Sequence, residues 1–549
     1  MSRIILRAAI STALAALLLS GCLVGPKYQK PPAMTQAPPA AYKESPGAAQ
    51  PGGGSAGNST AGNATVAGGT AASGTAAGAT QANAAATGTT GAQAADAGEW
   101  KVAQPQDAML KGKWWEIYKD DELNALEEKL AIDNQTIKQY FANFMEARTL
   151  VAEARSQLYP TLGTSPSYAR SQASANVGSG GAAGNKSQSN LTILPVDLSW
   201  EPDLWGRVRN QIKAQQYNAQ VSAADLENVR LSEQASLAEY FFEIHGQDAL
   251  AAIYQQTVAD DQKALELMRS EYETGVGDEI SVVEAQNTLQ NAQSALINLG
   301  VARAQYEHAI AVLTGSNPSA FSIAVKALSA VPPAVPIGVP SQLLERRPDI
   351  AAQERMMAAA NAEIGVAQAA FYPTLTLSAG GGLESSTLRH LFDWPSRFWS
   401  VGPTVSETIY DGGLRRAAVR QYTAIYDADV AGYRQTVLTA FQQVEDALAA
   451  ERILSRQIGQ QQMAAQSAQK VLDLETARYE TGVDPYIDVV TAQGTLLADR
   501  QTLATLHTQE MTASVQLIEA LGGGWDSTQL ATPEQVSKKL GAGEIEIQR

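Results

Sequence analysis

One stretch of the sequence occurs twice, and this internal duplication limits the possible folds more than any other feature. Tyr-Glu-Thr-Gly-Val is found at 272–276 and again at 479–483, and partial identity continues at the same offset as far as residue 493. Upstream, Tyr-Pro-Thr-Leu occurs at 159–162 and at 372–375. The copies are far longer than the units of about 20–50 residues that build solenoids. We therefore expect two copies of one large helix-and-strand unit within a single fold.

The N-terminus has the features of a bacterial secretory signal. Arg3 and Arg7 precede a short apolar run, and a Leu-Ser-Gly-Cys motif ends at Cys22. This motif resembles a lipobox, which implies that residues 1–21 are removed and that Cys22 carries a covalent lipid. The alternative is an unmodified cysteine beside a signal cleavage site. Leu23 occupies the position where Asp tends to retain such lipoproteins at the inner membrane, and therefore favours the outer membrane.

Residues 47–98 separate the N-terminal segment from the rest of the chain. They are almost wholly Gly, Ala, Ser, Thr, Asn and Gln, with Asp96 as their one charge and no aromatic residue. Such a composition buries too little apolar surface to offset the entropy of ordering the chain, which predicts a flexible linker. The expected segments are the signal peptide 1–21, a lipidated extended segment 22–46, the linker 47–98, a first structural repeat 99–330, a second structural repeat 331–525, and a C-terminal tail 526–549.

The charge and the cysteine content exclude several classes of protein. The formal net charge is −16 and the sequence has no basic patch, which argues against a nucleic-acid partner. No apolar run after residue 25 approaches the roughly 18 residues that suggest a membrane-spanning helix. Cys22 is the only cysteine, so the chain cannot form an internal disulfide.

The sequence also lacks the motifs of the common catalytic and metal sites. His245, His308, His390 and His507 are far apart, and Glu307-His308 has no partner at His-Glu-x-x-His spacing. Outside the low-complexity linker, where residues 53–57 match it by composition, there is no Gly-x-Ser-x-Gly motif, and the sequence has no phosphate-binding loop. We expect no enzyme activity, no bound metal, and no cofactor other than the lipid on Cys22.

Two stretches predict helices that are much longer than a globular core requires. Residues 207–273 contain no Pro and a single Gly, and residues 414–481 contain only two Gly. A 67-residue helix is about 100 Å long, a length that is typical of coiled coils and tubes. In the second stretch, apolar residues recur at spacings of four and three from Tyr426 to Ala447, which indicates a coiled-coil seam. The other expected helices cover residues 120–158, 280–313 and 343–371, and a last helix follows the Gly482 turn and ends at Leu521.

Four shorter segments read as β-strands: residues 161–172, 191–201, 374–384 and 398–410. Each is about as long as a membrane β-strand, which has roughly 9–11 residues. Four strands cannot close a barrel, and an open sheet edge is not tolerated in lipid. If these strands enter a bilayer, at least two chains must therefore share one barrel. The alternative is a small soluble sheet that packs under the helices.

Several motifs resemble the TolC-like outer membrane factors, in particular the NodT/OprM-type outer membrane lipoproteins of RND efflux systems. The mature chain would begin with Cys22 and Leu23, followed by Val-Gly-Pro-x-Tyr-x-x-Pro at 24–31. The resemblance covers about 100–525 in register, through motifs at 303–315, 343–350, 371–373, 410–413 and 520–525.

This resemblance implies a mainly α-helical chain with a membrane β-barrel. Three identical chains would form a twelve-stranded barrel in the outer membrane, continued by a twelve-helix tunnel in the periplasm. Such a homotrimer would be the exit duct of a tripartite pump that exports drugs or other small molecules. Its partners would be a periplasmic adaptor protein, an inner-membrane RND transporter and outer membrane lipid. Two alternatives stay open: the duct of a type I secretion or metal-efflux system, and a lipid-anchored periplasmic coiled-coil scaffold without a pore.

The two repeated turns are the candidate functional positions. Each reverses the chain between two helices and needs a residue that tolerates positive φ, hence Gly275 and Gly482. In the resembled family this end of the tunnel binds the adaptor. The docking candidates carried over are Tyr272, Thr274, Gly275, Val276, Tyr479, Thr481, Gly482 and Val483.

A gate is expected just beyond the turns, where the resembled family has acidic and apolar rings. The candidates for this constriction are Ile280, Glu284, Ile487, Asp488 and Thr491. Carboxylates around a narrow axis repel one another and attract cations. The alternative for the acidic residues is an ordinary solvated helix face. Pro485 follows only the second turn and makes the two copies unequal.

Overall fold

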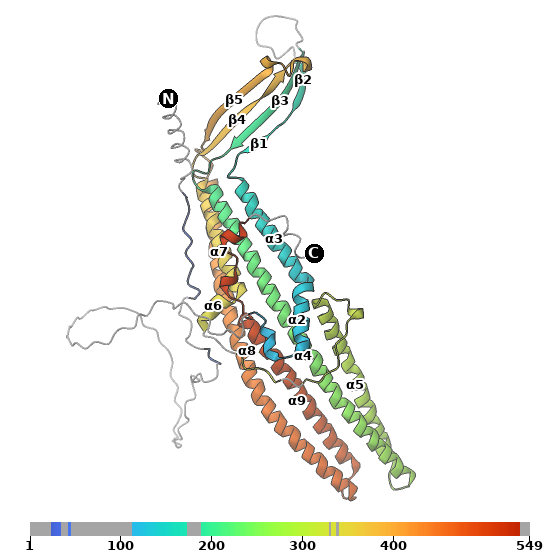
Figure 1. The fold of residues 1–549 in the computed structure, drawn as a ribbon. Helices are drawn as coiled ribbons and strands as arrows, with labels where there is room; N and C mark the ends of the chain where they lie inside the picture. Colours follow the sequence, from blue (N-terminus) through green and yellow to red (C-terminus); the bar gives the residue numbers. More distant parts are fainter. Residues whose placement is uncertain are drawn as a thin grey trace, which may run out of the picture.

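The computed structural model describes residues 23–34, 42–44, 112–172, 188–328, 331–335 and 340–538. The signal segment, Cys22 and the linker 47–98 lie outside these residues, so the expectations for them stay predictions. The described chain forms a long helical body with a separate antiparallel sheet at one end (Figure 1).

The helical body repeats one plan in the two halves. The long helices α4 (Arg207–Glu273) and α8 (Leu414–Glu480) have 67 residues each, and the helices that follow them, α5 (Glu279–Leu313) and α9 (Tyr486–Ala520), have 35 each. None of the helices in the described residues is long and apolar enough to cross a membrane. The remaining helices are α2 (Asp121–Asp133), α3 (Gln135–Ser156), α6 (Leu343–Arg346), α7 (Pro348–Ala369) and α10 (Pro533–Val536).

The helices are arranged in two tiers that share α4 and α8 (Figure 1). In the tier next to the sheet, α3 packs on α4, and α7 packs between α4 and α8. In the other tier, α5 packs on α4, and α9 packs between α4 and α8. The predicted seam of α8 is confirmed, since Tyr433, Val437, Ala440, Val444 and Ala447 are all buried.

Two of the expected helices are broken, and the breaks lie at equivalent points of the repeat. The helix expected over 120–158 is interrupted at Asn134, whose side chain caps α3 by accepting from the Ile137 amide at 2.9 Å. The helix expected over 343–371 is interrupted at Arg347, because the proline that follows disfavours a helical backbone in the residue before it. The apolar spacing continues across both breaks, so the sequence pattern predicts a single helix at each of them.

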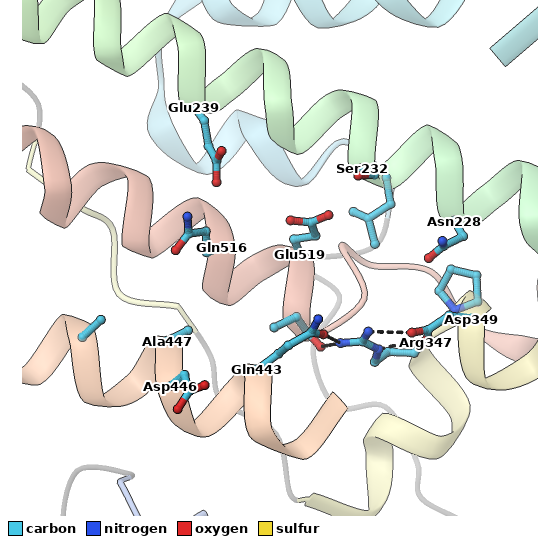
Figure 2. A pocket seen from close by; sticks show the side chains of 14 residues that line it. Asn228, Ser232, Glu239, Arg347, Asp349, Gln443, Asp446, Ala447, Gln516 and Glu519 are labelled. Atoms are coloured by element: carbon cyan, nitrogen blue, oxygen red, sulfur yellow. Dashed lines mark hydrogen bonds and ion pairs between the residues drawn. The ribbon is translucent and has the colours of Figure 1, made fainter. Parts of the chain in front are cut away.

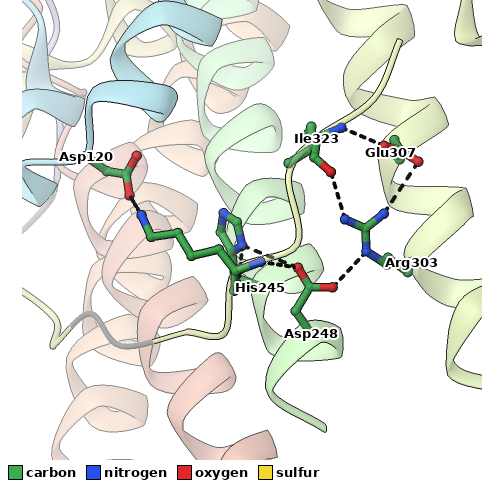
Figure 3. Close-up of polar contacts among 7 residues, drawn as sticks. Asp120, His245, Asp248, Arg303, Glu307 and Ile323 are labelled. Atoms are coloured by element: carbon green, nitrogen blue, oxygen red, sulfur yellow. Dashed lines mark hydrogen bonds and ion pairs between the residues drawn. The ribbon is translucent and has the colours of Figure 1, made fainter. Parts of the chain in front are cut away.

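The connection between the halves is fixed to α4 and α5 by a polar network centred on the buried Asp248 (Figure 3). Asp248 on α4 accepts from Arg303 Nε at 2.7 Å and from the Lys326 amide at 3.0 Å. Arg303 also donates to the Ile323 carbonyl at 2.9 Å. Lys326 in turn forms an ion pair of 2.8 Å with Asp120, the N-cap of α2. The network therefore fixes the start of the connecting segment to the helices of the first half.

The sheet is four strands wide and has two open edges. Its members are β1 (Thr161–Gly163), β2 (Ser167–Gln172), β3 (Gln188–Trp200), β4 (Thr374–Ser385) and β5 (Arg397–Ser406). β1 and β2 both pair with β3, which pairs with β4, which pairs with β5. The strand expected over 161–172 is thus in two pieces, because Pro166 in the gap cannot donate to the ladder. The strand expected over 398–410 ends at Ser406.

The two faces of this sheet differ in polarity. Residues paired across antiparallel strands point to the same face, and successive residues alternate. One face carries apolar side chains that the described chain leaves largely uncovered: Leu162, Val196, Leu198, Leu375, Leu377, Trp399, Val401 and Val405. The other face is mainly small and polar, with Asp197, Ser199, Thr376, Ser378, Ser400 and Thr404. The sheet projects from the end of the helical body, and neither face is covered by one of the long helices of the described chain (Figure 1).

Candidate functional site

The two hairpin turns have the same backbone geometry at the end of the body farthest from the sheet (Figure 1). In the first, the Val276 amide donates to the Glu271 carbonyl at 2.9 Å, and the Gly275 amide donates to the Tyr272 carbonyl at 3.0 Å. This pair of bonds is the Schellman motif, which requires a left-handed residue. Gly275 has φ +76° and Gly482 has φ +70°. The second turn has the equivalent bonds, from Val483 and Gly482.

The docking candidates differ in what their side chains do. Thr274 and Thr481 each donate a hydroxyl to carbonyls of the preceding helix turn, at 2.9–3.0 Å, so these side chains close the helix ends. The valines after the glycines point outward: Val276 is 83% exposed and Val483 is 65% exposed. Tyr272 is also exposed. The tips therefore present exposed valines and a glycine backbone, flanked by the exposed carboxylates of Glu273 and Glu480.

Tyr479, the repeat counterpart of Tyr272, is turned inward and joins the two hairpins. Its hydroxyl donates to Glu271 Oε2 on α4 at 2.6 Å. Its ring meets the ring of Tyr486 on α9 edge-on, with the centroids 5.5 Å apart. Burial, and the Glu271 carboxylate beside it, raise the pKa of Tyr479. Glu271 was not among the predicted site residues, because the contact depends on how the second hairpin packs on the first.

A buried carboxylate lies further along the same interface. Asp261 occupies the face of α4 that also carries Leu265 and Met268, which pack with Tyr486 and Val489 of α9. Its Oδ2 has no hydrogen-bond partner in the described chain. Burial, with a smaller contribution from the neighbouring Asp260, raises the pKa of Asp261 to about 6. A charged residue on the apolar stripe was visible in the sequence, and is the signal that could have identified it.

Three of the predicted gate residues lie together on α9. Asp488 and Thr491 line a hollow of about 510 Å³ between α8 and α9, and Ile487 is half-exposed beside them. Glu475, Asp484 and Asp488 offer carboxylate oxygens that all lie within 4.8 Å of one another.

One cation lies among these carboxylates. Arg478 donates to Asp484 Oδ1 at 2.9 Å, and this pairing lowers the pKa of Asp484. Glu475, Arg478 and Asp484 were not predicted as site residues. Their repeat counterparts in the first hairpin are Met268, Glu271 and Gly277, so a hollow with this set of charges can form only in the second hairpin.

The two predicted gate residues of the first copy lie elsewhere. Ile280 is exposed and Glu284 half-buried on α5, which packs against the α4 side of the body. Among the described residues, no hydrogen bond joins either of them to Ile487, Asp488 or Thr491.

Comparison with known proteins identifies the family. A family model described as outer membrane efflux protein matches residues 126–316 and 339–523, one match in each half of the chain. The chain belongs to the outer membrane efflux protein family. It is accordingly an outer membrane protein, and the duplication read from the sequence is the duplication of the family's own domain.

Relatives and solved structures agree with this assignment. Outer membrane protein OprJ of Pseudomonas aeruginosa is 32% identical over 446 residues, which cover 79% of this chain and 91% of OprJ. The toluene efflux pump outer membrane protein TtgF of Pseudomonas putida is 30% identical over 433 residues, 78% of this chain and 89% of TtgF. The structure of the outer-membrane channel OprN superposes with a TM-score of 0.71 at 26% identity, over 77% of this chain and 95% of OprN.

In this efflux protein the two tiers of helices meet at a polar junction (Figure 2). Arg347, at the start of α7, donates to the Ala520 carbonyl at the end of α9 at 3.0 Å and to Gln443 Oε1 on α8 at 2.8 Å. It also forms a two-pronged ion pair with Asp349 at 2.6 and 3.0 Å. A cavity of about 700 Å³ opens beside this pair. Burial, and then the nearby Glu239, raise the pKa of Glu519 on its wall.

The first half has its own version of this junction. Asn134, at the repeat position of Arg347, donates to the Leu313 carbonyl at the end of α5 at 2.9 Å. After each helix end comes a glycine in the left-handed region, Gly315 with φ +63° and Gly522 with φ +93°. The tiers are thus joined in the same way in both halves: a side chain donates to the carbonyl at the helix end, and a left-handed glycine follows. The donating side chain is Asn134 in the first half and Arg347 in the second.

Proposed function

We propose that this protein is the exit duct of a tripartite RND-type efflux pump and that it works as a homotrimer. Substrate would pass without chemical change from the periplasm to the exterior through a channel shared by three chains. The observation that carries this proposal is the projecting sheet, which has one uncovered apolar face, one polar face and two unpaired edges.

The two unpaired edges of the sheet would need strands from further copies of the chain. In lipid every backbone N–H and C=O must be satisfied, so an open edge must pair or the sheet must close. A sheet four strands wide is too narrow to close alone, because single-chain membrane barrels begin at about 8 strands. Three copies would pair β5 of one chain with the β1–β2 edge of the next, giving twelve strands with the apolar face toward lipid and the polar face toward the channel.

The N-terminal segment supports an anchor at the sheet end of the body. The Val24 amide donates to the Trp205 carbonyl at 3.1 Å, and Asn210 Nδ2 donates to the Val24 carbonyl at 2.7 Å. Leu23 packs so closely on Gly206 that a Cβ there would come within 2.6 Å of Leu23 Cδ1. A lipid on Cys22 would therefore enter the membrane close to the base of the strands, in agreement with a sheet that spans it.

The opposite end of the body is the proposed adaptor site. Three chains would bring six hairpin turns to one end of the tunnel, with the exposed valines and the glycine backbone facing the adaptor. The hollow around Asp488 and Thr491, next to Ile487, would line the constriction at this end. Three copies of its acidic side chains around one axis would attract cations.

The family and the names of the relatives support transport rather than catalysis. TtgF is a component of a toluene efflux pump, and a further relative of Pseudomonas putida, ArpC, is named as the outer membrane protein of an antibiotic efflux pump. We infer that small apolar or drug-like molecules are the substrates, selected by the transporter rather than by the duct. An inner-membrane RND transporter and a periplasmic adaptor would complete the pump.

The first test is the mass of the detergent-extracted protein, measured by light scattering and corrected for bound detergent. We expect a trimer, and we expect the purified protein to conduct ions in planar bilayers. The Cys22→Ser variant should still require detergent for extraction, because the strands hold it in the membrane. A monomer, or a Cys22→Ser protein released into the soluble fraction, would instead support a lipid-anchored scaffold without a pore.

The Tyr479–Glu271 contact predicts how the closed tip is held. Tyr479→Phe removes the only hydroxyl that links the second hairpin to Glu271 in the described chain. We expect single-channel conductance to rise and cells to become sensitive to vancomycin entering from outside, because the second hairpin can then swing away from α4. The loss of one hydrogen bond to a charged group, about 1.5–3 kcal/mol, corresponds to roughly a tenfold or larger increase in the open population.

The repeat supplies the control for this experiment. Tyr272→Phe makes the same chemical change at the counterpart position, which is exposed and forms no hydrogen bond through its side chain to the described residues. It should leave conductance and vancomycin resistance unchanged. The double variant Ile487→Ala, Asp488→Ala tests the constriction itself in the same assays. If this double variant conducts like the wild type, the narrowest point lies elsewhere.

A further inference from the structure

We propose that Arg397 and the loop before it, residues 386–396, bind the phosphate headgroup of an anionic lipid in the outer leaflet of the membrane. This headgroup site lies at the end of the sheet farthest from the helical body (Figure 1). The inference rests on the proposed function to the extent that the sheet must cross the membrane.

The register of the strands puts Arg397 on the lipid-facing side. Arg397 pairs with Leu383 of β4, two residues before Trp399 on the same strand. Paired residues share a face and alternate residues of a strand share a face, so Arg397 extends the row of Trp399 and Val401. A cation in this row costs about 2–4 kcal/mol at the bilayer midplane but about 0–1 near the interface. Its position at the last residue of the row therefore marks the outer interface.

The loop holds the guanidinium group over an aromatic ring. The Arg397 guanidinium carbon lies 3.4 Å from the centre of the Trp394 ring, a close cation–π contact. Trp394 is 75% exposed and Phe392 is 76% exposed, although both are large apolar side chains. Exposed aromatic side chains beside an apolar band are typical of the boundary between hydrocarbon and headgroups. The stacking orients the guanidinium group while leaving its N–H groups available.

The charge of the site is not neutralised by the protein. Within the described residues, neither Arg397 nor Arg389 forms an ion pair. Asp393, the one carboxylate of the loop, is paired with His390 at 2.7 Å. Glu384 pairs with Ile193 and so lies on the opposite, polar face of the sheet.

These features favour a lipid phosphate over a free anion. A guanidinium group binds a phosphate through two parallel N–H···O bonds, and an arginine stacked on an aromatic ring is preorganised to do so. Trp394 and Phe392 would contact the glycerol and the upper acyl chain of the same lipid. An inorganic phosphate would use only the charge and would leave both rings in water.

The experiment measures lipid retention by native mass spectrometry of the full-length protein, extracted in detergent. Phosphatidylglycerol and phosphatidylcholine with identical acyl chains are titrated separately. We expect the wild type to retain phosphatidylglycerol at about tenfold lower lipid concentration than phosphatidylcholine, and Arg397→Gln to abolish this difference. Trp394→Leu should reduce it while keeping the charge. The control Arg269→Gln, which removes an exposed arginine of α4 near the tips, should leave it unchanged.

Two results would overturn the proposal: equal retention of the two lipids by the wild type, or displacement of phosphatidylglycerol by millimolar inorganic phosphate, which would indicate a simple anion site. Trimer mass and conductance are recorded for the same samples. A trimeric, conducting protein without lipid preference would refute the headgroup site alone. A monomeric, non-conducting wild type would refute the proposed function.

Discussion

Gly522→Ala is expected to lower the free energy of unfolding by about 2–5 kcal/mol. Gly522 has φ +93°, a conformation that costs an L-residue about 1–2 kcal/mol. In addition, a Cβ at this position would lie 2.1 Å from the Arg346 carbonyl oxygen. That atom belongs to the backbone just before the break at Arg347, so it cannot move without shifting α7 relative to α9.

The hairpin turn supplies a control with the same backbone strain and no contact. Gly482 has φ +70°, and a Cβ there would have no neighbour within 4 Å. Gly482→Ala should therefore cost only the strain, about 1–2 kcal/mol. The measurement is the thermal unfolding midpoint by circular dichroism of the detergent-extracted protein. If the two variants unfold at the same temperature, the junction is looser than the structure indicates.

The counterpart in the first half extends the argument. A Cβ at Gly315 would lie 2.5 Å from the Asp133 carbonyl oxygen, next to the break at Asn134. The sequence alone aligns these two glycines at the repeat offset of 207. The neighbours of these glycines could not be predicted, because the carbonyl oxygens close to them belong to Asp133 at the end of α2 and Arg346 at the end of α6. Both helices are far from the glycines in sequence.

The bounds of the long helices were predicted almost to the residue, because the signals that end these helices lie in the local sequence. The helices expected over 207–273 and to residue 313 coincide with α4 and α5, because glycine turns and caps mark their ends in the sequence. By contrast, the breaks at Asn134 and Arg347 lie within continuous apolar patterns. The asparagine cap and the Arg-Pro pair are local signals that the apolar pattern hides. The contacts of Asn134 and Arg347 with the carbonyl ends of α5 and α9 depend on packing between distant segments.

The sequence repeat does not predict the different environments of its two tyrosines. Tyr272 and Tyr479 are identical in local sequence, yet one is exposed and the other donates to Glu271. The difference arises because α9 packs between α4 and α8, whereas α5 packs on the far side of α4. Local sequence predicts the turns and their glycines. It cannot predict which copy faces the other hairpin, since that depends on the packing of helices distant in sequence.

Val401→Arg is expected to prevent trimer assembly, whereas Ser400→Arg is expected to permit it, although the two residues are adjacent on β5. Val401 is 74% exposed on the apolar face, in the middle of the row between Trp399 and Val405, whereas Ser400 lies on the polar face opposite Gly380. An arginine facing lipid near the midplane costs about 2–4 kcal/mol. In a trimer the three copies together would cost about 6–12 kcal/mol, as much as the whole stability of many domains.

We therefore expect Val401→Arg to abolish heat-resistant trimers in outer-membrane fractions, as judged by gel electrophoresis. Ser400→Arg should assemble normally and instead lower cation conductance, because its charge would face the channel. Equal assembly of both variants would mean that the sheet does not enter lipid. If Ser400→Arg were the variant that failed to assemble, the faces would be reversed. Arg397 would then point into the channel, and the lipid headgroup site would fail with it, because both conclusions depend on the same alternation along β5.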